Sequence, residues 1–239
     1  MKRNPLLISV RDLDDPMVNH EVACFKRACG CDIDLVFAIN TKLQLGLADD
    51  RPALLFGGSG AYGVKCPDRW IQDLLDFMLL VVDEKIPSYA SCFGFQGLSL
   101  ALGGEISSDP ELQEMGIIPI DVSQAAVDDP LFGELPSTIL APSGHNDHVK
   151  RLPSGVTLMG RGKFVTNQAL KVDGAPFWAS QFHPELTKST LIDRWNYYRD
   201  VFSTDPLEIA AKDKMLSDSP DTPHVGSLLS RLIEFGANR

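Results

Sequence analysis

Short apolar runs alternate with helical patterns through the first half of the sequence, and this alternation constrains the fold more than any other feature. The apolar runs expected to form strands are residues 6–10, 34–39, 53–56 and 88–91. The expected helices cover residues 16–29, 68–84 and 93–102, and glycines at 30 and 103 stop the first and the third. A strand, a helix and a further strand in succession build a parallel sheet. The sequence therefore predicts an α/β fold with a mostly parallel open sheet and helices on both faces.

The second half of the sequence has a different pattern, with short strands joined by turns. The expected strands are residues 117–120, 137–140, 156–159, 164–166, 169–172 and 177–181. We expect them to extend the same sheet in antiparallel fashion, and we expect helix again from Leu191. The segment 203–223 is polar and acidic with three prolines, which predicts a loop-rich surface, and 226–235 predicts a closing amphipathic helix. The simplest organisation is one domain over 1–239, in which 203–239 is a loop-plus-helix C-terminal extension.

Charge and apolar run length exclude several classes of partner. The formal net charge is -10, whereas nucleic acids and anionic membranes attract basic surfaces. The longest apolar run, Phe77 to Val82, is far shorter than the roughly 20 residues that a transmembrane helix needs. The start of the sequence also lacks the apolar core and cleavage site of a signal peptide. We therefore expect no nucleic-acid or membrane partner, and a cytoplasmic location.

The five cysteines are an odd number, which predicts free thiols in a cytoplasmic chain. Three of them, Cys24, Cys29 and Cys31, lie close together, but their spacing matches no zinc pattern and no second Cys/His pair lies nearby. The sequence therefore predicts no metal and no cofactor.

Cys92 lies where the expected strand 88–91 changes into the helix 93–102. A tight turn at such a junction presents the side chain outward, and the amides of the helix start favour a thiolate. Small residues at Ala90 and Gly94 permit the crowded backbone of this turn. The local sequence alone fits a nucleophile and a buried structural cysteine equally well.

A second segment, Phe182-His183-Pro184-Glu185, follows the last apolar strand and favours the nucleophile. In an extended chain, residues two apart point to the same side, so Glu185 can hold one imidazole nitrogen of His183. The other nitrogen then remains for a thiol. Nucleophile, base and orienting carboxylate are the parts that covalent acyl transfer needs.

Cys92-Phe93-Gly94-Phe95-Gln96 and the His183 segment together resemble the class I glutamine amidotransferase family, whose fold is flavodoxin-like. The order of motifs matches from about Leu6 to Leu186. The resemblance implies a catalytic triad of Cys92, His183 and Glu185. It also implies that Gln96 and Gly94 contact the substrate.

A third segment is similar to a loop in the glutaminase portion of GMP synthetase. It comprises His145-Asn146-Asp147-His148-Val149 and the following Leu152-Pro153-Ser154-Gly155. On this resemblance His145 and Asp147 either contact the substrate or hold the loop that does so.

The glycine-rich stretch Leu54 to Gly63 has the G-x-G-x-x-G spacing of a dinucleotide loop. That interpretation needs a helix directly after the glycines, whereas residues 64–67 intervene before the next helix, and Gly63 is followed by Val64 where a phosphate loop has lysine. In the family, a glycine-rich loop at this place contributes to the oxyanion hole. We therefore expect the amides of Gly58 and Phe93 to stabilise the tetrahedral intermediate.

Three functions remain at this stage. The first is a glutaminase that takes L-glutamine and supplies ammonia to a separate synthetase, since the sequence has no second catalytic domain and no ATP-binding motif. The second is a stand-alone peptidase or hydrolase of γ-glutamyl compounds with the same triad. The third is a regulatory protein on the same fold, which an intact set of Cys92, His183 and Glu185 disfavours.

Overall fold

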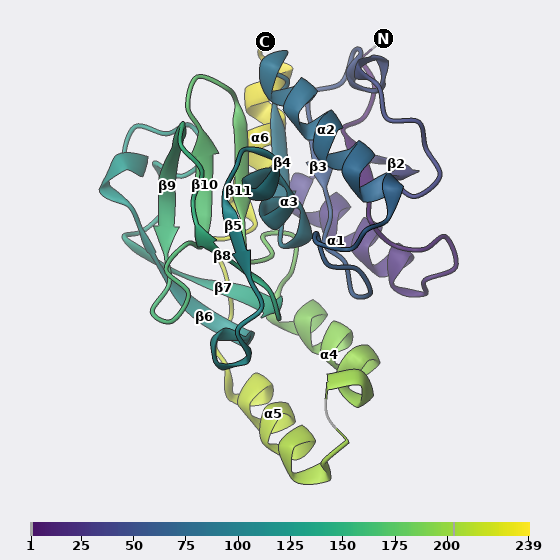
Figure 1. Ribbon diagram of the computed structural model, residues 1–239. Helices are drawn as coiled ribbons and strands as arrows, with labels where there is room; N and C mark the ends of the chain where they lie inside the picture. The colour runs from purple at the N-terminus through teal and green to yellow at the C-terminus, as the bar shows by residue number, and fades with distance from the viewer. Residues whose placement is uncertain (1, 203) are drawn as a thin grey trace.

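The computed structural model describes residues 2–202 and 204–239 and contains one sheet of nine strands (Figure 1). Five neighbouring strands are parallel, in the spatial order β2 (Asp34–Phe37), β1 (Leu6–Ser9), β3 (Leu54–Phe56), β4 (Ser88–Ser91) and β11 (Phe177–Ser180). The sheet continues with antiparallel strands, in the order β10 (Ala169–Val172), β9 (Val156–Arg161), β6 (Glu114–Val122) and β7 (Thr138–His145). The expected parallel sheet with an antiparallel extension is therefore confirmed.

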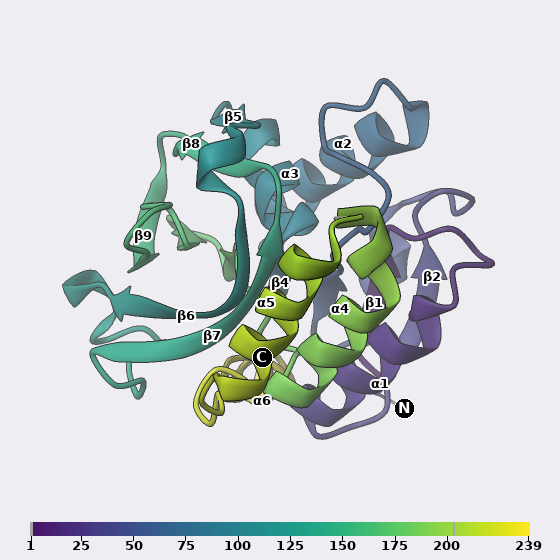
Figure 2. The same cartoon turned by 90° about the horizontal axis from the view of Figure 1, so that it is seen from below.

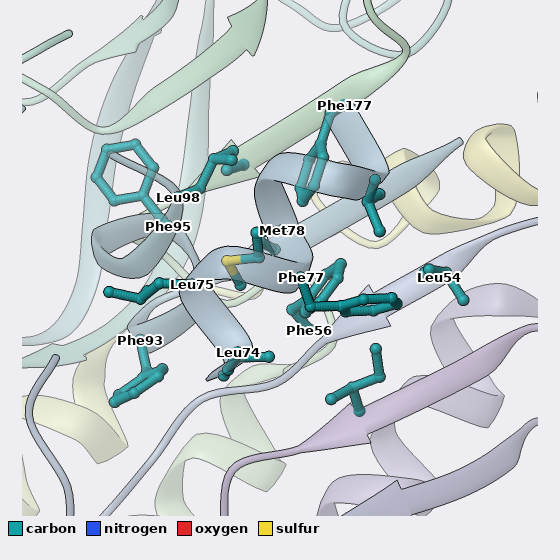
Figure 3. Packing of buried hydrophobic residues seen from close by; sticks show 14 of the residues in the cluster. Leu54, Phe56, Leu74, Leu75, Phe77, Met78, Phe93, Phe95, Leu98 and Phe177 are labelled. Atoms are coloured by element: carbon teal, nitrogen blue, oxygen red, sulfur yellow. The ribbon is translucent and has the colours of Figure 1, made fainter. Parts of the chain in front are cut away.

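Helices cover both faces of the parallel part, because its strands alternate apolar side chains between two cores. Leu6 and Ile8 of β1 pack with α2 (Arg69–Asp83) and α3 (Phe93–Ala101). Leu7 points the other way and packs with α1 (Met17–Cys29) and α6 (Ser227–Ala237). Figure 3 shows the first of these cores, in which the side chains of α2 and α3 meet those of the strands. The period-two pattern of the sequence thus sets the layers of the fold.

The two remaining α-helices, α4 (Lys188–Phe202) and α5 (Pro206–Asp218), lie side by side away from the sheet faces (Figures 1 and 2). They enclose a third, smaller apolar cluster with residues of α1 and of the turn after β11. Its fully buried members are Cys24, Leu186, Leu191, Trp195 and Leu216. Three short 3-10 helices cover Leu45–Ala48, Pro110–Leu112 and Gln124–Ala126.

The expectation of a loop over 203–223 is wrong for most of that segment, because α5 occupies its centre. Ser203 itself lies outside the described residues. The Asp205 side chain caps the helix by accepting a hydrogen bond from the Leu207 amide at 2.9 Å, and Pro206 occupies the first turn. Only Leu216 of α5 is buried, so the helix has almost no apolar periodicity from which the sequence could predict it. The C-terminal extension thus contains two helices instead of one.

The strand expected at 164–166 is also absent, and these residues form bends between β9 and β10. Phe164 is 67 % exposed, so the short apolar run is not buried against the sheet. In addition, β5 (Glu105–Ser107) and β8 (His148–Arg151) pair in a separate two-stranded sheet that the sequence pattern did not predict. No helix among the described residues is both long and apolar enough to cross a bilayer. The assignment of the whole chain to one domain stays a prediction.

Candidate active site

Cys92 sits on a strained turn between β4 and α3. Its backbone has φ 51° and ψ -100°, a region that residues other than glycine rarely adopt and that is concentrated at functional sites. The Cys92 amide donates to the carbonyl of Ser180 at 2.8 Å, which ties the turn to the end of β11. A Cβ at Gly94 would lie 2.9 Å from Ala90 Cβ and 3.1 Å from the Phe56 carbonyl. The small neighbours are therefore needed for the turn, as expected.

His183 reaches the same place from the next strand. β11 pairs in parallel with β4, with Ser180 opposite Ser91, so the chain leaves both strands at one edge of the sheet. The His183 amide donates to the Pro142 carbonyl at 2.8 Å, which fixes the backbone beyond the strand. The Cys92 side chain is a hydrogen-bond partner of the His183 imidazole. The structure thus brings together the two side chains that the sequence placed ninety-one positions apart.

Glu185 completes the set, although for a different geometric reason from the one expected. His183 Nδ1 lies 2.7 Å from Glu185 Oε1, and the Glu185 side chain is fully buried. Both residues lie beyond the end of β11, in a turn closed by a hydrogen bond from the Leu186 amide to the His183 carbonyl. The turn, and not the extended chain, brings the two side chains together. His183 Nε2 remains for the thiol.

The buried pair polarises strongly. Burial alone would lower the pKa of His183, but the charges of Glu185 and Cys92 and their hydrogen bonds outweigh it and raise the pKa to about 9. Burial likewise would raise the pKa of Glu185, but His183 and then Arg194 lower it to about 2. At neutral pH the imidazole is therefore protonated beside an ionised carboxylate, as an acid that protonates a leaving amine must be.

Gly58 and Phe93, the expected oxyanion donors, both border Cys92. Gly58 follows β3, and a Cβ at this position would lie 3.0 Å from His183 Cε1 and 3.7 Å from Cys92 Cβ. Phe93 is the first residue of α3, where backbone amides have no acceptor within the helix. Only glycine lets the loop approach both side chains this closely. Two backbone segments therefore flank the sulfur, as an oxyanion hole requires.

A cavity of about 250 Å³, which we call the acyl pocket, lies in front of Cys92. Its lining includes three expected substrate residues, Gln96, His145 and Asp147, and excludes Gly94, which packs against the sheet. Gln96 Nε2 donates to the Asp147 carbonyl at 2.6 Å, and His145 Nε2 lies 3.0 Å from Glu114 Oε2. Both side chains hold the loop that forms the pocket wall. They can also contact a substrate, because they line the pocket.

Two further buried side chains of the site carried no sequence motif. Gln181 Nε2 donates to Cys92 Sγ at 3.8 Å, and its Oε1 accepts from Gln96 at 3.3 Å. Arg194 of α4 places Nη1 3.5 Å from Glu185 Oε1 and 3.3 Å from His183 Nδ1. The one signal for Arg194 was its helical spacing from Leu191, which put a charged residue on a buried helix face. Among the described residues, no cluster of His, Cys, Asp and Glu side chains could hold a metal ion.

Comparison with protein families identifies one match. The model of "Glutamine amidotransferase class-I" matches residues 17–195, most of the chain. Among curated relatives, one of the two subunits of a glutamine-hydrolysing GMP synthase from Methanocaldococcus jannaschii is 29 % identical over 107 residues, which are 45 % of this chain and 55 % of that protein. "GMP synthase [glutamine-hydrolyzing]" of Thermosipho africanus is 30 % identical over 114 residues, which are 48 % of this chain and 21 % of that protein. The match thus spans about half of the first relative and a fifth of the second.

Solved structures support the same fold over nearly the full length of the chain. A glutamine amidotransferase from Thermotoga maritima has a TM-score of 0.70 at 18 % identity, covering 97 % of this chain and 99 % of that one. A glutamine amido transferase from Methylobacillus flagellatus has a TM-score of 0.73 at 15 % identity, covering 98 % and 96 %. The fold is the flavodoxin-like fold of these proteins. From the family match together with the fold, the chain belongs to the class I glutamine amidotransferases.

Proposed function

We propose that this protein hydrolyses the amide of a γ-glutamyl group through a thioester on Cys92. The observation that carries the proposal is the contact chain at one sheet edge: Cys92 beside the His183 imidazole, and His183 Nδ1 2.7 Å from Glu185. The sulfur attacks the γ-carbonyl carbon, and the amides of Gly58 and Phe93 stabilise the negative oxygen. His183 then gives its proton to the departing nitrogen. Water, deprotonated by His183, releases glutamate and restores the thiol.

The first candidate substrate is L-glutamine, with ammonia passing to a separate synthetase. The names of the relatives support it, since one of them is part of a GMP synthase described as glutamine-hydrolysing. On this proposal the activity of the chain alone is low and rises when the partner binds. We also propose a cytoplasmic location, which the five free cysteines support.

The second candidate is a γ-glutamyl peptidase or hydrolase that acts without a partner. The same three side chains would perform the chemistry. It is favoured by a cavity that adjoins His183 on the side where the leaving group departs.

Ammonia release from glutamine by the purified chain, with and without the partner synthetase, tests the proposal. The first candidate predicts slow release alone and at least about tenfold stimulation. Release without a partner at several turnovers per second, in the usual range of enzymes, supports the second candidate. No release under either condition, and none from γ-glutamyl compounds, would contradict the proposed chemistry.

Replacing Gly58 by alanine should lower kcat/KM about 100-fold, because small misplacements of reacting groups have effects of this size. The new Cβ would press on His183 Cε1 from 3.0 Å and push the imidazole away from the sulfur. Gly46→Ala is the matched control, since its nearest contact would be 3.7 Å away and it lies outside the site. Steady-state kinetics decide, with the thermal midpoint measured to confirm folding. Wild-type kinetics for a folded Gly58→Ala protein would contradict this placement of the loop.

A further inference from the structure

Two more cavities continue from the acyl pocket past His183, and together we call them the leaving-group cleft. The inner cavity, about 150 Å³, adjoins the acyl pocket, because Ser59, Gly60, Gly144 and Asn146 line both. The outer cavity, about 520 Å³, adjoins the inner one, because Met115, Asn146 and Trp195 line both. Cys92 lines the acyl pocket and His183 the inner cavity, so nucleophile and acid stand on opposite sides of the junction.

This arrangement gives the cleft a direction. The acyl part of a substrate must lie against Cys92, and the departing nitrogen must lie against His183, which protonates it. Whatever is bonded to that nitrogen therefore extends into the inner cavity. Ammonia is about the size of a water molecule, whose share of liquid volume is about 30 Å³. The inner cavity alone is several times larger than ammonia needs, so it accommodates a larger amine.

The inner cavity is lined with hydrogen-bond donors. Arg194 is buried, and its Nε and Nη2 have no hydrogen-bond partner among the described residues. Arg11 Nη1 donates to Tyr198 Oη at 2.7 Å, which leaves the phenol proton for another acceptor. Burial in the first place raises the pKa of Tyr198, so the phenol keeps that proton. Acidic groups already engage both arginines, Glu185 at Arg194 and Asp15 and Glu21 at Arg11, but no acidic side chain lines the cavity itself among the residues that the structure describes.

The outer cavity has a different lining. Met115, Trp195, Ala211 and Met215 supply an apolar surface between β6, α4 and α5. Its charged residues include Glu208 and Lys212, one turn apart on α5, and Glu114, which already contacts His145 and Gln168. The family match ends at residue 195, so Tyr198 and the α5 residues lie beyond it. This part of the cleft is therefore a feature of this chain outside the matched region.

An amino acid matches both parts of the cleft. When its nitrogen is at His183, its carboxylate carbon is two bonds away, about 2.5 Å, so the carboxylate falls in the inner cavity. An apolar side chain, or the next residue of a peptide, falls in the outer one. Carboxylates are the groups that guanidinium and phenol donors bind well.

We propose that the leaving-group cleft is a subsite for the amino acid that departs from a γ-glutamyl amino acid or short γ-glutamyl peptide. Arg194 and Tyr198 face the carboxylate, and the apolar residues of the outer cavity take the side chain. The subsite rests on the proposed thioester chemistry. The carbon–nitrogen bond of the γ-amide breaks, His183 supplies the proton of the departing amine, and water completes hydrolysis to glutamate and the free amino acid.

The test compares three substrates with the full chain alone: γ-L-glutamyl-L-leucine, γ-L-glutamyl-L-leucinamide and L-glutamine, with glutamate release as the readout. We expect kcat/KM for the leucine compound to exceed that for the leucinamide about tenfold, because only the former carries the carboxylate. Tyr198→Phe should bring this ratio close to one. Tyr197→Phe is the matched control, because Tyr197 is the neighbouring tyrosine, is 47 % exposed and lines neither cavity. It should keep the wild-type ratio.

Each outcome decides. Equal kcat/KM for leucine and leucinamide, or an unchanged ratio in Tyr198→Phe, overturns the subsite. Hydrolysis of glutamine without hydrolysis of either larger compound also overturns it, while the proposed thioester chemistry stands. If none of the three substrates is hydrolysed and an electrophilic glutamine analogue does not label Cys92, the proposed function itself fails. The comparison of leucine and leucinamide needs no variant, so it remains decisive if Tyr198→Phe does not fold.

Discussion

Replacing Cys92 by alanine should abolish hydrolysis of glutamine and of γ-glutamyl compounds, with a loss of kcat on the order of 10⁶, as when other enzymes lose a covalent nucleophile. Cys92 is the cysteine at the strained turn, with φ 51°, and the one that is a hydrogen-bond partner of His183. Without the sulfur no thioester forms, and water has no positioned activator. Glutamate release, measured with excess protein over hours, gives the residual rate.

Cys31→Ala serves as the control for the loss of one thiol, because Cys31 lies beyond the end of α1 at the other end of that helix from the site. It should retain the wild-type rate. Circular dichroism and the thermal midpoint confirm that both variants fold. A Cys92→Ala protein that is folded, pure and fully active would show that the reaction uses another group.

Replacing Glu185 by glutamine should lower kcat at neutral pH about 10⁴-fold, the effect seen when the orienting carboxylate of another triad becomes an amide. The carboxylate lies 2.7 Å from His183 Nδ1 and raises the pKa of the imidazole to about 9, together with Cys92 and against the effect of burial. An amide removes that charge. It also leaves Arg194 beside the imidazole without its anionic partner.

The same substitution should change the pH profile in a defined direction. In the wild type, the proton that His183 gives to the leaving amine is present below a pKa of about 9 and lost above it, so kcat/KM should fall as pH rises through about 9. In Glu185→Gln the pKa of His183 falls, and the descending limb should move to lower pH. Glu234→Gln, an exposed position on α6, should leave the limb unchanged. A limb that stays in place in Glu185→Gln would contradict the role of this carboxylate.

Much of the site was predictable because its residues follow strands. Cys92 and His183 come directly after apolar runs that form β4 and β11, and in an α/β sheet parallel strands end at a common edge. The helix at 16–29 was predictable for a similarly local reason, since Gly30 ends it with φ 70°. The prediction that Glu185 faces His183 was right in its result, but it assumed an extended chain where the structure has a turn.

What the sequence did not predict depends on contacts between distant segments. Arg194 acquires its place beside Glu185 only because α4 packs across the turn after β11, and helical spacing alone does not say which element a helix covers. α5 was missed because it has a single buried residue, Leu216, so its formation depends on the Asp205 cap and on packing against α4. The leaving-group cleft is bounded by both helices, and it follows from the structure and not from any motif.

Covalent labelling of the full chain by 6-diazo-5-oxo-L-norleucine, an electrophilic analogue of glutamine, tests the central claim most directly. Intact-mass measurement and peptide mapping should find one adduct per chain, located on Cys92, with glutamine slowing its formation. Labelling should be lost in Cys92→Ala and strongly slowed in His183→Asn, which keeps the thiol but removes the imidazole. An adduct on any other of the five cysteines, or equal labelling rates with and without the imidazole, would contradict the account.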